Sequence, residues 1–279
     1  MMEYVLFTGA TGGLGEVCVK ALSYTNRFTV FAAGTNDDKL SGYKSLANVI
    51  PLHMDITDDF SVLAAQKTIA EHTDRLAAIV NFAGRSAFVS MVEGSSVELS
   101  QRLLDVNVMG MIRVNRMFFE MLLKGRGRII NCSSEAGWMT AQPFAAPYFL
   151  SKRAVEAYSD SLRRELMFLG IPVIKIQPGS FQTNMTQNTL AGFHQTLSET
   201  KYYQNVLSRL KPLMMQELKH NNDASKLVKV VLRALNAKHP KIKYRVGTGK
   251  MLAMLELLPE KGVDLLYKWL LTLMPQRTN

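Results

Sequence analysis

Short runs of β-branched and other apolar residues recur along this chain, and stretches with helical periodicity separate them. Within each run successive residues are apolar, which indicates strands that are buried on both faces. Because buried parallel strands need crossover helices, the pattern predicts an α/β fold with a doubly wound parallel sheet and helices on both faces. The strands are expected at residues 4–8, 29–33, 49–54, 77–82, 128–132, 172–177 and 243–246.

The chain is expected to form a single domain over residues 1–279, because no linker rich in Pro, Gly or Ser, no low-complexity run and no repeat divides it. With 47% hydrophobic and 20% charged residues it can bury a large core, as a soluble globular protein does. Ligands of such sheets bind beyond the carboxyl ends of the strands. The polar motifs of this chain lie at those ends.

A glycine-rich turn follows the first strand. It contains Gly9, Gly12, Gly13 and Gly15, and a helix is expected to start near Glu16. Glycine lets the backbone turn tightly and lets a pyrophosphate approach the helix N-terminus, where free N–H groups favour anions. A plain tight turn can also use glycine. The position between a strand and a helix favours dinucleotide binding and a Rossmann-like fold.

Tyr148 and Lys152 lie one helical turn apart, downstream of Ser133 and Ser134. Residues four apart share a helix face, so the ammonium of Lys152 can lie close to the phenol of Tyr148. A free tyrosine has a pKa near ~10, and a fixed cation favours the phenolate, which helps the proton to exchange with a substrate oxygen. Together with the glycine turn, this group predicts a carbonyl reductase or an alcohol dehydrogenase.

Three further motifs are NFAG at residues 81–84, DVNVMG at 105–110 and PGSFQT at 178–183. With the preceding motifs, in this order, the chain resembles the short-chain dehydrogenase/reductase family (SDR) from about Tyr4 to Thr183. The glycine spacing fits both the common dehydrogenase pattern and a longer epimerase-like pattern. The NFAG motif, the serine pair and the modest length look like the hydroxyl dehydrogenases. The closing KYRVG and the leucine-rich tail look like hydroxysteroid and retinol dehydrogenases.

The resemblance implies four catalytic residues. Tyr148 would be the general acid for ketone reduction and the general base in reverse, and Lys152 would lower its pKa and hold the nicotinamide ribose. Ser134, chosen over Ser133, would polarise the carbonyl oxygen. Asn107 would lie in a helix kink and support a water that relays protons. Hydride transfer itself belongs to the cofactor.

The resemblance also implies a cofactor site for NAD(P)(H). The expected residues are Gly9, Thr11, Gly13, Leu14, Gly15, Thr35, Asn36, Asp55, Ile56, Asn81, Ala83, Gly84, Tyr148, Lys152, Pro178, Gly179 and Thr183. The second strand is followed neither by an acidic residue for a ribose diol nor by an arginine for a 2′-phosphate. Thr35 and Asn36 can donate hydrogen bonds to a phosphate, although Asp37 and Asp38 are close. NADP(H) is therefore favoured slightly over NAD(H).

Two of these positions have a second interpretation. Asp55 matches the family position near adenine, and equally fits a helix cap before Asp58. Phe82 replaces a second asparagine that is common in the family, where Asn81 would stabilise the sheet. The loop at residues 135–147 is expected to carry an extra residue, because Ser134 lies farther from Tyr148 than the family pattern has it.

Residues 185–221 have an irregular pattern and lie where the family carries its substrate lid. Trp138, Phe144 and Met185 are candidates for the lining of a site for a bulky lipophilic alcohol or ketone, such as a steroid or retinoid. Residues 248–279 form a C-terminal amphipathic extension, with leucine-rich stretches at 251–258 and 263–274. These stretches could pack over the substrate mouth, form a subunit interface or contact a membrane, and packing is favoured because amphipathic helices usually face a core.

The sequence also allows two other classes of function besides an oxidoreductase. A non-catalytic dinucleotide-binding regulator would not need the intact set of Ser134, Tyr148, Lys152 and Asn107. Epimerase or dehydratase chemistry on a nucleotide sugar would retain the cofactor tightly without consuming it. The resemblance further implies a homodimer or homotetramer through the helices near Leu103 and Ala154.

Composition narrows the partners and the location. The net charge of +10 comes from scattered basic residues, so no nucleic-acid partner is expected. The 5 histidines form no ligand-spaced cluster, which predicts no metal. No apolar stretch is long enough to span a bilayer. The first strand leaves no room for a signal peptide and the 2 cysteines suit a reducing compartment, so the chain is expected to be cytoplasmic, with peripheral membrane contact as the alternative.

Overall fold

The computed structural model describes residues 2–182, 184–219 and 222–273. Its centre is a 7-stranded sheet in the order β3-β2-β1-β4-β5-β6-β7, in which every neighbouring pair is parallel. The strands are β1 Glu3–Thr8, β2 Phe28–Gly34, β3 Val49–His53, β4 Ala78–Asn81, β5 Arg128–Cys132, β6 Val173–Pro178 and β7 Lys243–Val246. The predicted doubly wound parallel sheet is confirmed.

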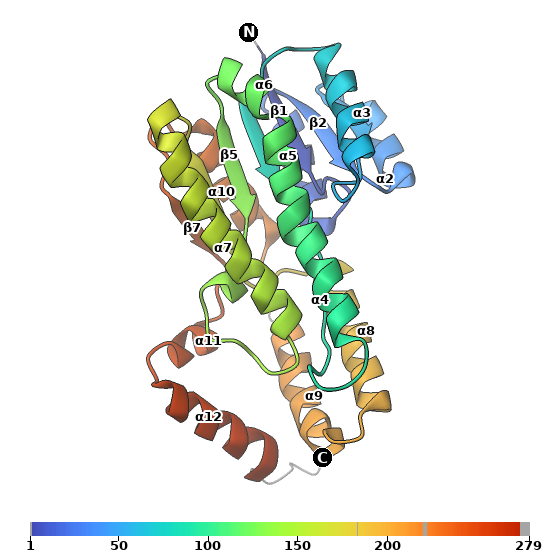
Figure 1. The fold of residues 1–279 in the computed structure, drawn as a ribbon, viewed down its shortest axis with the longest axis vertical. Coiled ribbons are helices and arrows are strands. Elements are labelled where there is room, and N and C mark those ends of the chain that lie inside the picture. The colour runs from blue at the N-terminus through green and yellow to red at the C-terminus, as the bar shows by residue number, and fades with distance from the viewer. Residues whose placement is uncertain (1, 183, 220–221, 274–279) are drawn as a thin grey trace.

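Helices connect the strands and extend the molecule below the sheet. They are α1 Gly13–Ser23, α2 Asp37–Ser41, α3 Asp59–Ala70, α4 Ser96–Leu104, α5 Met111–Met117, α6 Phe119–Lys124, α7 Ala146–Leu166, α8 Asn184–Glu199, α9 Gln204–Lys219, α10 Ala224–Asn236, α11 Lys250–Leu255 and α12 Glu260–Lys268. A π-helical turn, Asp105–Gly110, joins α4 to α5, and another, Trp269–Leu273, follows α12. The sheet occupies the upper half of Figure 1, and α8, α9, α11 and α12 lie in the lower half.

Two hydrophobic cores cover the two faces of the sheet. Val5 and Phe7 of β1 point into one core, with side chains of α1 and α10. Leu6, which lies between them in sequence, points into the other core, with side chains of α3, α5, α6 and α7. Strand residues alternate between faces, so burial of all three explains the continuous apolar runs in the sequence. In Figure 1 the α3, α5 and α7 layer lies toward the viewer and α10 lies behind the sheet.

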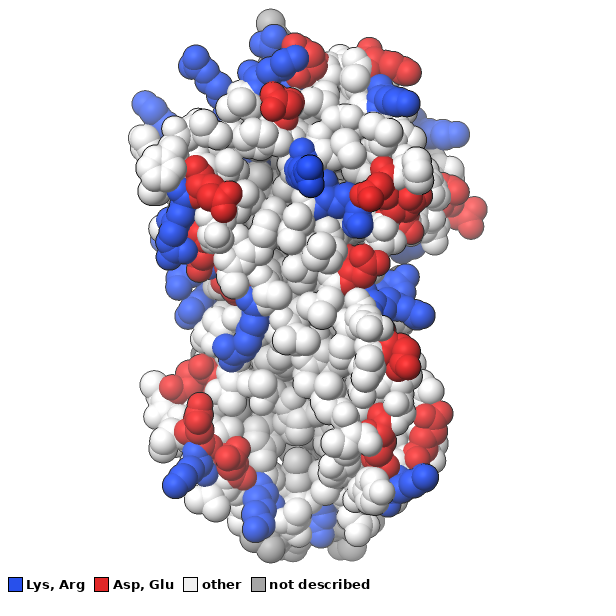
Figure 2. Space-filling view, viewed as in Figure 1, with Lys and Arg blue, Asp and Glu red and all other residues white. Residues whose placement is uncertain are grey.

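Charged residues lie around the margins of the molecule. On the face shown in Figure 2, Lys and Arg side chains are spread along the outline and are mixed with acidic ones. The centre of this face is uncharged, and no compact basic stripe crosses it.

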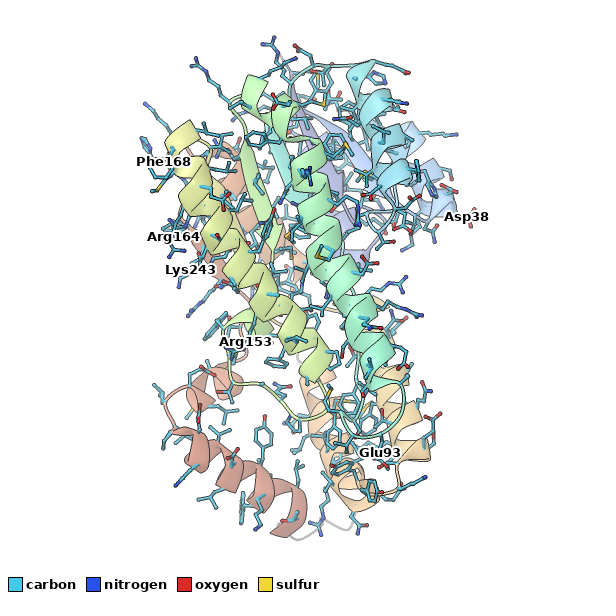
Figure 3. The ribbon with its side chains drawn as sticks, in the orientation of Figure 1. Asp38, Glu93, Arg153, Arg164, Phe168 and Lys243 are labelled. Carbon is cyan, nitrogen blue, oxygen red and sulfur yellow. The ribbon has the colours of Figure 1, made fainter. Side chains whose placement is uncertain are left out.

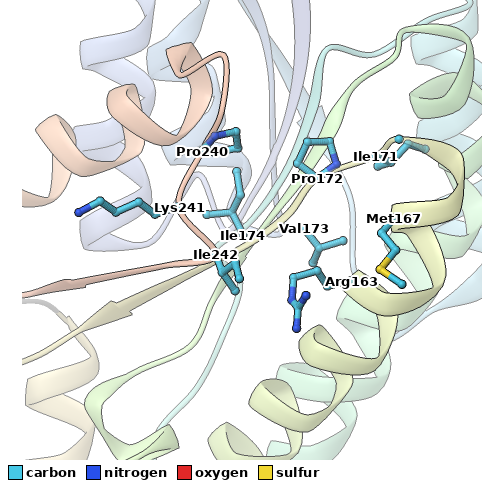
Figure 4. Close-up of a pocket in the computed structure, with 10 residues that line it drawn as sticks. Arg163, Met167, Ile171, Pro172, Val173, Ile174, Pro240, Lys241 and Ile242 are labelled. Atoms are coloured by element: carbon cyan, nitrogen blue, oxygen red, sulfur yellow. The ribbon is translucent and has the colours of Figure 1, made fainter.

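A small hollow of about 270 Å³ lies where β6 and β7 begin, at the end of the sheet opposite the carboxyl ends of the strands. Figure 4 shows its wall of apolar side chains, including Met167, Ile171 and Pro172. Because the polar motifs lie at the other end of the sheet, this hollow is not connected with them.

The turn between β1 and α1 is held against the loop that follows β4. Gly9 has a φ of 69°, and a Cβ there would lie 2.5 Å from the backbone nitrogen of Ala83. A Cβ on Gly15 would lie 2.1 Å from the carbonyl oxygen of Gly9. The helix starts at Gly13, three residues before the predicted Glu16, because Gly12 is the N-cap and accepts a hydrogen bond from the Glu16 nitrogen at 2.8 Å.

We expect Gly9→Ala to lower the free energy of unfolding by about 2 kcal/mol or more, because the added methyl meets backbone atoms at a positive φ. Gly42→Ala is the matched control. Nothing lies within 4 Å of a Cβ at Gly42 and its φ is −62°, so this change should stabilise the protein by about 0.5 kcal/mol. Urea unfolding measures both, and equal effects would contradict the crowding of Gly9.

Candidate active site

A cavity of about 1030 Å³ opens at the carboxyl ends of the strands. Its wall brings together side chains and backbone from the glycine turn, the ends of β2 to β6 and the start of α7. Among the residues expected from the sequence, those that line it are Gly9, Thr11, Gly13, Leu14, Gly15, Thr35, Asp55, Ile56, Ala83, Gly84, Ser134, Tyr148, Lys152, Pro178 and Gly179.

Three of the expected catalytic and cofactor-binding residues that the structure describes do not line the cavity. The side-chain oxygen of Asn36 caps α2 by accepting a hydrogen bond from the Lys39 nitrogen at 2.9 Å. Asn81 and Asn107 are buried behind the wall. Thr183 lies outside the described residues.

Asn81 joins two strands and a helix. Its Nδ2 donates to Oδ1 of Asn115 on α5 at 2.8 Å and to Oδ1 of Asn131 on β5 at 3.0 Å. The Nδ2 atoms of Asn115 and Asn131 donate in turn to Tyr158 and Ser159 of α7. Buried amides are stabilising only when they are hydrogen-bonded, and this network holds β4 and β5 beneath α5 and α7.

Asn107 lies in the π-helical turn Asp105–Gly110, which is a local widening of the helix where α4 meets α5. Its Oδ1 accepts from the nitrogen of Arg85 at 2.7 Å, and its Nδ2 donates to the Arg85 oxygen at 2.9 Å and to Ser151 Oγ at 2.9 Å. Asn107 therefore fixes the loop after β4 to the helix of Tyr148. π-turns of this kind occur often at functional sites.

Ser134, Tyr148 and Lys152 meet on the wall of the cavity. Lys152 Nζ donates to the carbonyl oxygen of Cys132 at 3.0 Å and lies 5.8 Å from the centroid of the Tyr148 ring. Burial raises the pKa of Tyr148, and a hydrogen bond with Ser134 opposes that shift. The sequence predicts that Lys152 lowers the pKa of Tyr148. In the structure the desolvation of the phenol outweighs the groups that favour its charged form.

Lys152 is itself buried, with 4% of its surface exposed. Burial lowers its pKa, because an ammonium loses the solvation that water gives it, while Cys132 and Glu156 oppose this shift.

Asp55 forms a turn of its own and does not cap a helix. Its Oδ1 accepts from the nitrogen of Thr57 at 2.9 Å and from Thr57 Oγ1 at 2.7 Å, and the Thr57 N–H lowers the pKa of the carboxyl group. Asp58 caps α3 instead, by accepting from Phe60 and Ser61. Asp55 therefore lines the cavity and does not cap α3, and its position near an adenine stays a prediction.

Lys39 was missed in the sequence analysis. Its ammonium donates to the carbonyl oxygen of Thr11 in the glycine turn at 3.0 Å and lies 3.8 Å from a carboxylate oxygen of Glu16. Asp37 pairs with His53 at 2.7 Å, and Asp38 points outward from the molecule in Figure 3. A lysine one turn into the helix after the second strand was the available signal, because this helix faces the glycine turn.

The lower part of the cavity is apolar. Met185 of α8 and Met214 of α9 line it, as does a further set of side chains of α9 and the C-terminal segment that the sequence had not singled out: Leu210, Leu213, Leu255, Leu266, Tyr267 and Leu270. The signal was their spacing on amphipathic helices.

Trp138 and Phe144 lie elsewhere. The Trp138 ring is covered by the Arg245 guanidinium, whose Cζ lies 3.6 Å from the ring centroid. Phe144 packs between Phe88 and Tyr203, at centroid distances of 5.6 and 5.3 Å. The contacts of Phe144 belong to the small core that joins α8 and α9 to the preceding loops.

No group of three or more His, Cys, Asp or Glu side chains within the described part of the chain is arranged to hold a metal ion. None of the described helices combines the length and the apolar character that a bilayer span requires.

The sequence profile of the short chain dehydrogenase family matches residues 3–192, and the chain belongs to this family. Retinol dehydrogenase 16 of Mus musculus is 33% identical over 287 residues, 96% of this chain and 88% of that protein. The 17-beta-hydroxysteroid dehydrogenase type 6 of Homo sapiens is 31% identical over 258 residues, 88% of this chain and 80% of that protein. The structure of a Burkholderia phymatum short chain dehydrogenase/reductase in complex with NAD has a TM-score of 0.75 at 19% identity, over 95% of each chain.

These similarities confirm the predicted family and its retinol and hydroxysteroid dehydrogenase branch. The chain is an NAD(P)-dependent oxidoreductase that acts on CH–OH groups. A non-catalytic regulator and an epimerase or dehydratase, the two alternatives, are not favoured.

Proposed function

We propose that this protein interconverts a secondary alcohol and a ketone, or a retinoid-type alcohol and aldehyde, on a bulky lipophilic substrate such as a steroid or retinoid. One observation carries the proposal. A single cavity joins Ser134, Tyr148 and Lys152 to the glycine turn on one side and to an apolar wall from α8, α9 and the C-terminal segment on the other. The names of the mouse and human relatives agree with this substrate class.

The residues of the cavity fit a dinucleotide. Glycine residues form the turn where a pyrophosphate would approach the start of α1. A Cβ on Gly9 or Gly15 would collide with backbone atoms. Free N–H groups at a helix N-terminus favour phosphate there. Lys152 would donate to the nicotinamide ribose hydroxyls. When bound, the cofactor supplies or accepts the hydride.

The proton chemistry is assigned to the protein. For reduction, the Tyr148 hydroxyl donates its proton to the substrate oxygen while Ser134 donates a hydrogen bond to the same oxygen as negative charge develops. For oxidation, the phenolate of Tyr148 removes the hydroxyl proton, which requires Lys152 to remain charged beside it. Asn107 holds the loop after β4 and Ser151 of α7 in register, and its family role in a water relay stays a prediction.

The direct test is consumption of NADPH or NADH by purified protein with ketosteroids, retinal and small ketones, followed by absorbance. We expect turnover with the bulky carbonyls. Ser134→Ala should lower kcat about 10²-fold or more, because it removes a donor aimed at developing charge. Ser133→Ala is the matched control. It should change kcat less than threefold, which is far less than the loss of a donor aimed at developing charge would cause.

Two results would contradict this proposal. Equal losses in the two serine variants would remove the assignment to Ser134. Absence of turnover with every carbonyl, in protein that binds a reduced nicotinamide cofactor, would remove the proposed reaction.

For the cofactor we propose a preference for NADP(H) over NAD(H). Lys39 supports it, because its ammonium lies at Thr11 on the rim of the cavity, close to the end of β2 where Thr35 is exposed to the cavity. Asp37 is already paired with His53. A positive charge at this edge attracts a phosphate on the adenosine ribose.

Lys39→Ala should reduce the ratio of NADPH to NADH affinity about tenfold, or about 1.4 kcal/mol, measured by cofactor fluorescence at fixed ionic strength. Lys20→Ala is the control. Lys20 carries the same charge and pairs with the same Glu16 at 2.7 Å, yet makes no hydrogen bond to the glycine turn. A ratio that Lys39→Ala leaves unchanged would contradict this role.

We propose that α8 and α9, within residues 185–221, form the substrate lid, and that the described part of residues 248–279 covers the substrate end of the cavity. Leu255, Leu266 and Leu270 lie on its wall. Other side chains of the same segment are exposed, among them Met254, Leu257, Leu265 and Trp269, and the prediction of peripheral membrane contact rests on these. A cytoplasmic location and a homodimer or homotetramer stay predictions.

A further inference from the structure

Glu156 lies one helical turn beyond Lys152 on α7, and only 14% of its side chain is exposed. One carboxylate oxygen accepts a hydrogen bond from Gln177 Nε2 at 2.8 Å, and the other lies 2.8 Å from the ammonium of Lys175. A buried carboxylate costs free energy unless it is paired and hydrogen-bonded. Both partners come from β6, so the sheet itself fixes this carboxylate.

The loop that carries Ser134 packs against the side chain of Glu156. A Cβ on Gly137 would lie 2.8 Å from Glu156 Cγ and 3.1 Å from its Oε1. Gly137 ends the short turn that begins after Ser134. Glu156 is therefore packed behind the loop that carries Ser134 as well as one turn from Lys152.

Glu156 belongs to a cluster of charged side chains. Lys175, with 7% of its side chain exposed, lies 2.8 Å from Glu156 and 2.8 Å from Asp160, and Arg163 Nε lies 3.9 Å from Asp160. Of the two carboxylates, Glu156 is the buried one, and it lies one helical turn from Lys152 on the same face of α7. In the described part of the chain Lys152 makes no direct ion pair and donates to the Cys132 carbonyl, so the Glu156 carboxylate is the acidic group of its own helix face.

We propose that Glu156 is a positioning residue that keeps the ammonium of Lys152 charged and in place on the wall of the cavity. The neighbours of Lys152 and those of Glu156 together determine how strongly Glu156 acts on the charge of Lys152. Tyr148 and Glu156 of α7 and Cys132 of β5 face Lys152. Lys175 and Gln177 of β6 and Asp160 of α7 surround Glu156, and Arg245 of β7 donates to Gln177 at 3.2 Å.

The physical reason is the low polarity of the site. Burial lowers the pKa of Lys152, and the charge of Glu156 opposes this shift. Without the carboxylate, Lys152 would lose its proton at a lower pH. The neutral amine would hold the tyrosine phenolate and a ribose hydroxyl less well than the ammonium does. The consequence for turnover rests on the proposed function, whereas the charge state of Lys152 can be measured without any substrate.

The test is the titration of Lys152 by NMR in protein labelled at the lysine Cε, with the signal assigned by its absence in Lys152→Met. In Glu156→Gln we expect Lys152 to lose its proton about one pH unit lower, a tenfold change in the ratio of charged to neutral amine. Glu156→Asp keeps the charge but withdraws it by one methylene group, so about half of the shift should remain.

Asp160→Asn is the matched control. Asp160 lies on the same helix and pairs with the same Lys175, but 37% of its side chain is exposed, so solvent screens it and the Lys152 titration should move by less than a third as much. Thermal unfolding of each variant shows that the folded protein is being titrated. If Glu156→Gln does not fold, the comparison of Glu156→Asp with wild type decides, because the shorter side chain should still lower the titration of Lys152 measurably.

An unchanged Lys152 titration in Glu156→Gln would overturn the inference, and so would an equal shift in Asp160→Asn, because the effect would then belong to the whole cluster. An unchanged titration in Glu156→Asp would overturn it where Glu156→Gln cannot be studied. A wild-type protein that reduces no carbonyl while Lys152 still shifts in Glu156→Gln would end the proposed function and support this inference.

Discussion

The close approach of two backbone segments, the turn after β1 and the loop after β4, determines the shape of the site. At Gly9 the two segments approach so closely that a single methyl group would collide with Ala83. Gly15 in turn packs against the Gly9 carbonyl, which aims the start of α1 at the cavity. Because parallel strands present these segments at one edge of the sheet, the glycine turn and the loop of Ala83 and Gly84 form one wall of the cavity.

The opposite wall depends on α7. This long helix carries Tyr148 and Lys152 at the cavity, Glu156 behind the loop of Ser134, and Ser159 in the asparagine network between α7 and the sheet. Asn107 connects α7 to the loop after β4 through Ser151 and Arg85. The helix that carries Tyr148 and Lys152 is thus held to the sheet by buried hydrogen bonds on several sides, and this rigidity preserves the distance between Tyr148 and the glycine turn.

Electrostatics in the site is a balance between burial and charge. Burial raises the pKa of Tyr148 and lowers that of Lys152, so both groups tend toward their neutral forms. A proton donor for ketone reduction benefits from the first effect, because the phenol keeps its proton at neutral pH. The second effect works against the proposed role of Lys152, and interactions with Cys132 and Glu156 oppose it.

Much of the fold could be predicted because each strand is a continuous apolar run. The seven expected strands agree with the observed ones, and two of them, Arg128–Cys132 and Lys243–Val246, agree in both bounds. The start of α1 was misplaced, because Gly13 and Gly15 have low helical propensity, whereas in the fold Gly15 packs against the Gly9 carbonyl.

Contacts between residues far apart in sequence explain what could not be predicted. The pattern of residues 185–221 was interpreted as irregular and not as the two helices α8 and α9, which are stabilised by packing on Phe88 and Phe144. The motifs located the glycine turn, Ser134, Tyr148 and Lys152. Lys39 and Glu156 belong to no motif, and their importance depends on Thr11 and Lys175, which only the folded chain brings to them.

The most direct test of the account is Tyr148→Phe, measured for both cofactor binding and turnover. Loss of one buried hydroxyl should leave NADPH affinity within about threefold of wild type, because binding rests on the glycine turn and Lys152. Carbonyl reduction should fall by at least about 10²-fold, since the proton donor is gone. Retention of turnover in a variant that binds the cofactor normally would contradict the assignment of Tyr148 and, with it, the proposed mechanism.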